Sequence, residues 1–240
     1  MPLAKRRVSP YISRRHPPFI GSASFWQTIQ LIKAGIKVNR PGLKRTQTAD
    51  KSPRPFRVGE PHRLIAEARA RLVNLSSSGH RFADVDLDDP NFERTPYTEF
   101  GAYGRSKTAN ILFAVEFDRR HKANGVRATA VHPGVIQTEL GRHLQPEVLQ
   151  QLIDQINSTN SAAGEPAFSW KTIPQGAATS VWAGVVAAAD KVGGLYCEDC
   201  HVAEITDADD SLRGVRAYAL DPDRAKALWA RSEEMVGERF

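Results

Sequence analysis

The sequence has few of the features that mark secreted or membrane-spanning proteins. Its 240 residues include two cysteines, Cys197 and Cys200, too few for a disulfide-stapled domain. Their CxxC spacing has no second pair, which favours a structural role over metal binding. No run approaches the roughly 18 apolar residues of a membrane-spanning helix. These absences predict a cytoplasmic protein with no membrane span and no metal site.

Acidic residues are absent from the first 49 positions, and charge is unevenly distributed along the chain. Residues 1–70 contain 15 Lys or Arg against three Asp or Glu, whereas the remaining 170 residues contain 18 against 24. Eight of the 15 prolines also fall within residues 1–70. The contrast predicts a basic, Pro-rich, irregular segment over 1–70, with one helix starting at Ser24, and a folded domain over 71–240.

The basic segment leaves three interpretations open. It can be a remnant or mistranslated sequence, an Arg-rich organelle-targeting peptide, or a patch that binds nucleic acid or another anionic surface. No recognisable nucleic-acid-binding fold accompanies the charge, which disfavours a nucleic-acid partner.

From Arg71 onward, segments with strand character alternate with segments of helical periodicity. We expect strands at 71–77, 126–134 and 193–199, helices at 103–125, 174–190 and 221–236, and a long surface loop at 80–101. Asp221 and Pro222 suit the first positions of the last helix. Alternating strands and helices predict an α/β fold whose parallel sheet is covered by helices.

The stretch AYGRSKTAN places Tyr103 and Lys107 one helical turn apart, so a phenol and an ammonium share one helix face. Taken alone, such a pair is typical of a solvated helix face. A phenol with a pKa near 10 is a weak acid–base group at neutral pH unless its phenolate is stabilised. A neighbouring ammonium lowers that pKa, so the pair is a candidate for proton transfer.

The pair belongs to an ordered set of motifs. These are NLSSSGH (74–80), YGRSK (103–107), VHPGVIQTEL (131–140), IPQGAATSVW (173–182) and GLYCEDCHV (194–202). Over some 170 residues the set resembles the C-terminal catalytic half of the short-chain dehydrogenase/reductase family, in particular its retinol-dehydrogenase-like branch. The resemblance implies a Rossmann-like sheet and NAD(P)-dependent interconversion of alcohols and carbonyls.

The resemblance also implies a role for each matching residue. Tyr103 is the expected acid–base, and Lys107 modifies its pKa and anchors the nicotinamide ribose. Ser77 is expected to polarise the substrate oxygen, because the family's catalytic serine is usually the second of its Ser-Ser pair. The expected cofactor-binding residues are Tyr103, Lys107, Pro133, Gly134 and Thr138. Residues from about 140 to 170 correspond to the family's substrate lid.

The sequence departs from the family in residues 1–70, which lack its Gly-rich TGxxxGxG turn and the asparagine of its catalytic tetrad. We therefore expect a sheet that is incomplete on the N-terminal side and weak or absent binding of NAD or NADP. The alternative is a catalytically inactive, truncated or frameshifted remnant that binds partners through its basic N-terminus. The bare edge of strand 71–77 leaves a homo-oligomer open. The branch implies lipophilic alcohols or aldehydes as substrates.

Overall fold

The computed structural model describes residues 70–138, 145–209 and 213–239. The predictions of an irregular basic segment, a helix from Ser24 and an incomplete N-terminal side all concern residues 1–69, which lie outside the described part. Within the described ranges, no helix is long and apolar enough to cross a membrane. The same ranges contain no group of three or more His, Cys, Asp or Glu side chains able to hold a metal ion.

A four-stranded sheet in the order β1–β2–β3–β4 forms the centre of the described chain. Its strands are β1 (Arg71–Leu75), β2 (Arg127–His132), β3 (Tyr196–Glu198) and β4 (His201–Val202). The first three are parallel, with Val73 opposite Thr129 and Ala130 opposite Tyr196. β4 pairs antiparallel with β3. The predicted α/β class with a mainly parallel sheet is confirmed, whereas the short antiparallel strand was not predicted.

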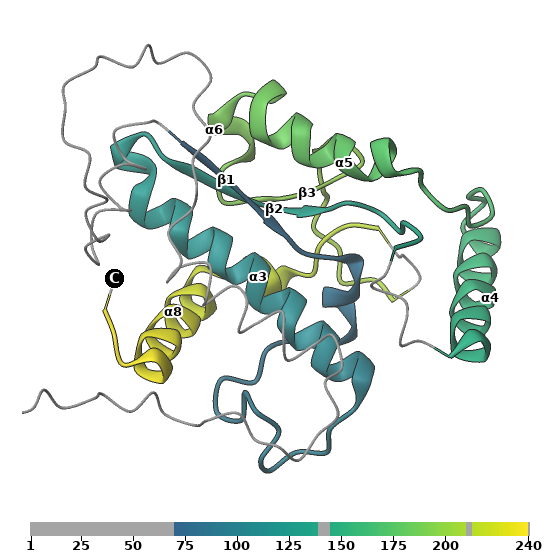
Figure 1. The fold of residues 1–240 in the computed structure, drawn as a ribbon, viewed down its shortest axis with the longest axis horizontal. Helices are drawn as coiled ribbons and strands as arrows, with labels where there is room; N and C mark the ends of the chain where they lie inside the picture. Colours follow the sequence, from purple (N-terminus) through teal and green to yellow (C-terminus); the bar gives the residue numbers. More distant parts are fainter. Residues whose placement is uncertain (1–69, 139–144, 210–212, 240) are drawn as a thin grey trace, which may run out of the picture.

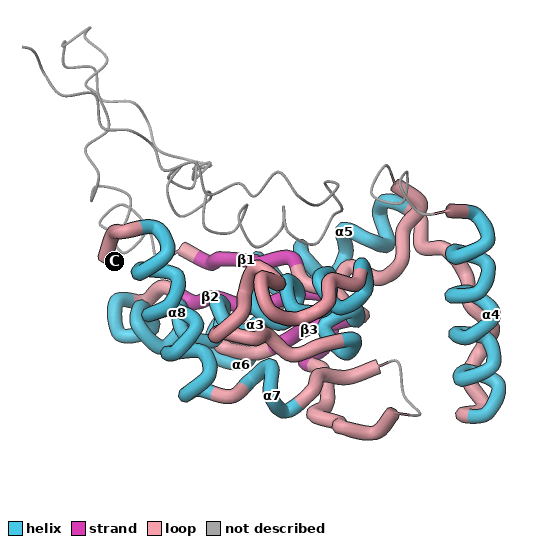
Figure 2. Tube along the Cα trace, turned by 90° about the horizontal axis from the view of Figure 1, so that it is seen from below, coloured by secondary structure: helices cyan, strands magenta, loops and turns pink. Residues whose placement is uncertain are grey.

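Helices cover both faces of the sheet, the doubly wound arrangement of Rossmann-like folds. Figure 1 shows α3 (Glu99–His121) and α8 (Pro222–Val236) on one face, and α5 (Ile173–Val181) and α6 (Ala189–Val192) on the other. The 3-10 helix η1 (Ser78–Phe82) follows β1, and α7 (Ala217–Leu220) precedes α8. Between β2 and α5, α4 (Pro146–Ala162) is set apart from the sheet (Figure 2).

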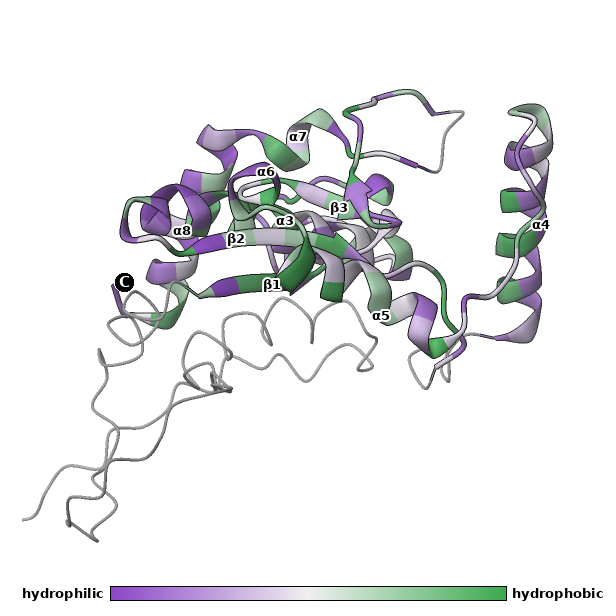
Figure 3. Cartoon of the chain, turned by 90° about the horizontal axis from the view of Figure 1, so that it is seen from above, coloured by the Kyte–Doolittle hydropathy of each residue, from purple (hydrophilic) through white to green (hydrophobic). Residues whose placement is uncertain are grey.

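The core divides along the alternation of side chains in the strands. Val131 and Cys197 pack with Ala183 on the α5 face. Ala130 and Tyr196, both completely buried, pack with Ile111 of α3 on the other face. In contrast, α4 has hydrophobic and hydrophilic residues interspersed along its length (Figure 3), yet none of its residues is buried. The catalytic candidates Tyr103 and Lys107 thus lie on α3, which has many buried residues, and Ser77 lies in the turn after the half-buried strand β1.

The helix expected over 174–190 is interrupted, which corrects that prediction. α5 ends at Val181 and passes into a π-helical turn, Trp182–Val186, before the chain becomes extended at Ala187. The guanidinium of Arg71, on β1, donates to the carbonyls of Ala183 at 3.1 Å and of Ala187 at 2.6 Å. These bonds satisfy carbonyls that a continuing helix would use, and they fix the turn against the sheet.

Helix α3, expected over residues 103–125, starts four residues earlier, at Glu99. Thr98 is its N-cap, with a side chain that accepts a hydrogen bond from the backbone N–H of Gly101. Tyr103 therefore lies in the second turn of α3 and Lys107 in the third. The helix expected over 221–236 is confirmed, with Asp221 accepting from the N–H groups of Asp223 and Arg224.

Candidate active site

The three consecutive serines after β1 have separate environments. Ser76 is buried, and its hydroxyl donates to the carbonyl of Lys107 at 2.8 Å. Ser77 has an extended backbone and caps η1, where its oxygen accepts from the N–H of Gly79 at 3.0 Å. The Ser77 side chain also lies close enough to the Tyr103 phenol to act on its pKa, in the lowering direction. The structure thus brings Ser77, the serine chosen from the sequence, to the phenol.

The phenol of Tyr103 lies in a largely buried position. Burial raises its pKa above the ordinary value, and the hydrogen bond with Ser77 acts in the opposite direction. The Lys107 ammonium lies over the Tyr103 ring, 5.3 Å from the ring centroid. From the sequence, Lys107 was expected to lower the pKa of Tyr103, but burial dominates and raises it. The role of Lys107 as a modifier of that pKa stays a prediction.

The Lys107 side chain is largely, though not completely, buried. No carboxylate pairs with it in the part of the chain that the structure describes, and burial lowers its pKa to about 8. An ammonium has three donors and no acceptor, so an uncompensated one in a buried site suits hydroxyl or other oxygen acceptors of a ligand. The ribose of a nicotinamide cofactor supplies such acceptors, and the residues present therefore fit that end of the cofactor.

Two asparagines lock the helix that carries Tyr103 and Lys107 to the strand that leads to Ser77. Asn110 of α3 donates through Nδ2 to the carbonyl of Leu75 at 2.9 Å. Asn74 of β1 donates through Nδ2 to the carbonyl of Asn110 at 2.7 Å. With the bond from Ser76 to Lys107, these contacts fix the spacing between the candidate groups. Asn110 was not among the residues expected from the sequence, although a polar residue inside a mostly apolar helical stretch was a usable signal.

The Pro133–Gly134 turn follows β2 at the same edge of the sheet where Ser77 follows β1. Gly134 has φ of 88°, the left-handed region that favours glycine. The Lys171 side chain passes over its α-carbon and forms an ion pair with Asp199. The space beside the Gly134 α-carbon is therefore occupied by the Lys171 side chain, a residue that was not expected at the site from the sequence. Thr138 is exposed and is the last residue of the described range 70–138.

Gly79 is a third contributor to the site that was not expected from the sequence, after Asn110 and Lys171. A Cβ placed on Gly79 would lie 2.4 Å from Cε1 of Tyr103 and 2.7 Å from its Cδ1. The aromatic ring therefore packs directly on the Gly79 backbone, and the missing side chain is what admits it. The glycine between the serines and His80 was visible in NLSSSGH, but nothing in the sequence paired it with Tyr103.

Gly79→Ala is expected to displace the Tyr103 ring and lower the free energy of unfolding by about 1–3 kcal/mol, the usual cost of overpacking. Gly184→Ala is the matched control, because its Cβ would meet Val73 at an ordinary 3.5 Å. Denaturant unfolding measures the stability, and the Tyr103 ring signals in NMR spectra report its position. Equal stability of the two variants would contradict the contact.

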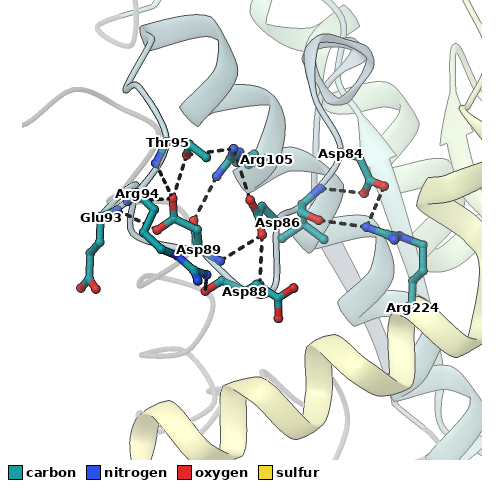
Figure 4. A network of polar contacts seen from close by, with 10 residues as sticks. Asp84, Asp86, Asp88, Asp89, Glu93, Arg94, Thr95, Arg105 and Arg224 are labelled. Carbon is teal, nitrogen blue, oxygen red and sulfur yellow. Dashed lines mark hydrogen bonds and ion pairs between the residues drawn. The ribbon is translucent and has the colours of Figure 1, made fainter.

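A network of aspartates holds the loop that precedes α3 (Figure 4). The carboxylate of Asp89 accepts from the N–H groups of Glu93, Arg94 and Thr95 and from the Thr95 hydroxyl, at 2.7–3.1 Å. Arg105, between Tyr103 and Lys107 in sequence, donates to the carbonyl of Asp89 at 3.0 Å. The loop is thereby tied to the same helix as the candidate catalytic groups.

The Asp89 network is expected to loosen in acid. Burial acts to raise the pKa of Asp89, but the hydrogen bonds from Thr95, Glu93 and Arg94 outweigh it and lower the pKa to about 2. A carboxylate with a folded-state pKa below its unfolded value stabilises the fold above about pH 4, and this contribution is lost as pH falls toward 2. The amide protection of residues 93–95, taken relative to their intrinsic exchange rates at each pH, should fall over that range. Asp89→Asn should show fast exchange already at neutral pH, and exposed Asp154→Asn should not.

Comparison with known proteins gives a consistent set of relatives, although no family model matches the chain. The chain is 41% identical over 170 residues to an oxidoreductase of Streptomyces lividans, covering 70% of this chain and 56% of the relative. It is 37% identical over 172 residues to the short-chain dehydrogenase/reductase prx1 of Penicillium rubens, covering 71% and 48%. Human retinol dehydrogenase 14 is 33% identical over 178 residues, covering 72% and 46%. The chain thus spans about half the length of the curated relatives it matches.

Proposed function

Because the chain belongs to the short-chain dehydrogenase/reductase family through this stretch, we propose that it interconverts an alcohol and a carbonyl compound with NAD or NADP. Residues 71–240 supply the catalytic half. The observation that carries the proposal is the convergence of Ser77, Tyr103 and Lys107, in which a largely buried phenol lies near a serine hydroxyl and near an ammonium that no carboxylate of the described residues pairs with.

The direction of the Tyr103 pKa suits reduction of a carbonyl at neutral pH. Since burial raises that pKa, the phenol is protonated and can donate its proton to the substrate oxygen. The Ser77 hydroxyl stabilises the charge that develops on the same oxygen. The bound nicotinamide supplies or accepts the hydride. Lys107 holds the ribose hydroxyls, and we assign Pro133, Gly134 and Thr138 to the nicotinamide end.

An exposed aromatic pair beside the site supports a lipophilic substrate. Phe82 and Phe100 are 48% and 40% exposed and contact each other edge to face, with ring centroids 5.4 Å apart. Phe100 lies one helical turn before Tyr103, and Phe82 lies beside Gly79. Apolar side chains exposed at this position can contact the apolar part of an alcohol or aldehyde. The name of the human relative, a retinol dehydrogenase, agrees with this class.

Titration with NADH and NADPH, followed by nicotinamide fluorescence, tests the proposal. Saturable binding is expected, weakened roughly 10-fold or more in Lys107→Met, because hydrogen bonds from a charged group contribute about 1.5–3 kcal/mol. Affinity should also fall as pH rises through about 8, where Lys107 loses its charge. Lys191→Met, on an exposed lysine, is the control. No binding at millimolar cofactor would favour the inactive remnant.

A further inference from the structure

His80 is a completely buried imidazole three residues after Ser77, and the proposed mechanism does not use it. Its Nδ1 lies 2.8 Å from the carbonyl oxygen of Ser77, and its Nε2 lies 3.1 Å from the backbone nitrogen of Arg216. Both ring nitrogens are thus engaged, on opposite sides of the ring. The imidazole bridges the Ser77 turn and the segment that enters α7.

The partners of the ring fix its protonation state. The Arg216 backbone N–H can only donate, so Nε2 must accept, and the proton of the neutral ring lies on Nδ1. That proton is donated to the Ser77 carbonyl, which also accepts from the His80 backbone N–H at 3.1 Å. Burial lowers the pKa of His80 to about 4, with Arg81 and Arg216 acting in the same direction. The neutral form with Nδ1–H is therefore present at neutral pH.

Elements on three sides hold His80 in place. Its carbonyl accepts from the hydroxyl of Tyr218, on α7, at 2.7 Å and from the hydroxyl of Thr108, on α3, at 3.2 Å. Its ring lies against that of Tyr196, on β3, with centroids 5.1 Å apart. Thr108 is the residue after Lys107. The His80 backbone is thus held from α3 and α7 and its ring contacts β3, so the whole residue is fixed beside the Ser77 turn.

We propose that His80 is a positioning residue that holds the backbone of Ser77 so that the Ser77 hydroxyl meets the Tyr103 phenol. The hydrogen bond from His80 Nδ1 fixes the backbone carbonyl of Ser77. The hydrogen bond from the Gly79 N–H fixes the side-chain oxygen of Ser77. With both in place, the hydroxyl proton is left for the phenol oxygen or the substrate. The catalytic part of this inference rests on the proposed function, whereas the coupling between His80, Ser77 and Tyr103 does not.

The pKa of Tyr103 reports this coupling whether or not the protein turns over a substrate. The bond with Ser77 acts to lower that pKa, so Ser77→Ala should raise it. His80→Phe keeps an aromatic ring against Tyr196 but removes both ring hydrogen bonds, and it should raise the Tyr103 pKa by the same amount. The double variant should show no further rise, because both changes remove one interaction. His80→Gln, which can donate and accept, should restore the wild-type value.

The measurement is an alkaline titration of protein labelled with [13Cζ]tyrosine, in which Tyr103→Phe assigns one of five tyrosine signals. Exposed His201→Gln should leave the Tyr103 pKa unchanged. An unchanged Tyr103 pKa in His80→Phe, or a shift that adds fully to that of Ser77→Ala, would overturn the proposal. Turnover assayed separately with NAD(P)H tests the proposed function, so failure of either idea is visible by itself.

A second pair of variants keeps the test decisive where His80→Phe fails to fold. Arg216 has φ of −67°, which proline adopts without strain, so Arg216→Pro removes the N–H that donates to Nε2 and leaves the backbone path in place. Arg216→Ala removes the guanidinium and keeps the N–H. We expect the Tyr103 pKa to rise in Arg216→Pro relative to Arg216→Ala. Equal values in the two variants would contradict the bracing of His80.

Discussion

Tyr103→Phe is expected to lower the rate of nicotinamide-linked carbonyl reduction by about 10²–10⁴-fold, the range that a positioned proton donor contributes. The substitution removes the hydroxyl on whose pKa Ser77 acts and leaves the ring that packs on Gly79 under the Lys107 ammonium. The loss should therefore fall on kcat, with cofactor affinity close to that of the wild type. Steady-state kinetics with NADPH or NADH and a lipophilic aldehyde measure the effect.

Tyr97→Phe is the matched control for this prediction. Tyr97 lies in the loop before α3 and packs edge to face on Phe92, with ring centroids 5.2 Å apart. Removal of its hydroxyl tests the loss of a phenol from the same region without touching the Ser77 contact. A Tyr103→Phe variant as active as Tyr97→Phe would show that another group delivers the proton.

The sequence allowed the site to be assembled because each of its residues lies at a fixed place in a regular element. Tyr103 and Lys107 share a face of α3 by helical spacing alone, and the serines end a strand that runs parallel to β2. Since the carboxyl ends of parallel strands meet at one edge, Ser77 and the Pro133–Gly134 turn lie at the same edge of the sheet. The choice among three serines came from a family resemblance, and the contact of Ser77 with Tyr103 supports it.

What the sequence did not reveal depends on contacts between distant residues. The π-helical turn after Val181 depends on a guanidinium from Arg71, 112 residues away from the Ala183 carbonyl that it contacts. No local pattern in residues 174–190 encodes that bond. The roles of Gly79 and His80 likewise arise from side chains of α3, β3 and α7. The periodicity of apolar residues in the sequence identifies helices and strands. Contacts with residues distant in the sequence determine where a helix is interrupted and where only glycine fits.

The second large effect is expected at the junction of α3 and β2. Asp118 is 4% exposed, and its carboxylate accepts from Arg127 Nε at 2.8 Å and from Arg127 Nη2 at 3.1 Å. The backbone N–H of Ala128, in β2, adds a third bond at 2.9 Å. This pair therefore connects the last turns of the helix that carries Tyr103 and Lys107 to the strand beside β1, and it fixes where the helix stops against the sheet.

Asp118→Ala is expected to lower the free energy of unfolding by about 3 kcal/mol, because it leaves a mostly buried guanidinium and a buried N–H without their acceptor. This value is at the low end of the destabilisation seen when a buried ion pair loses one partner, because the Arg127 side chain keeps 19% of its surface exposed. Urea unfolding of the full chain measures the change. Glu234→Gln, which breaks an exposed ion pair with Arg231 on α8, should stay within about 0.5 kcal/mol of the wild type.

The double variant Asp118→Ala with Arg127→Met separates the loss of the pair from the burial of a lone charge. If the penalty in Asp118→Ala comes from the uncompensated guanidinium, removing that group as well should recover part of the stability. The Ala128 N–H remains without its acceptor in both variants, so recovery should be incomplete. Full additivity of the two single changes would show that Asp118 and Arg127 act independently, and that the helix end is held by packing of α3 on the sheet instead.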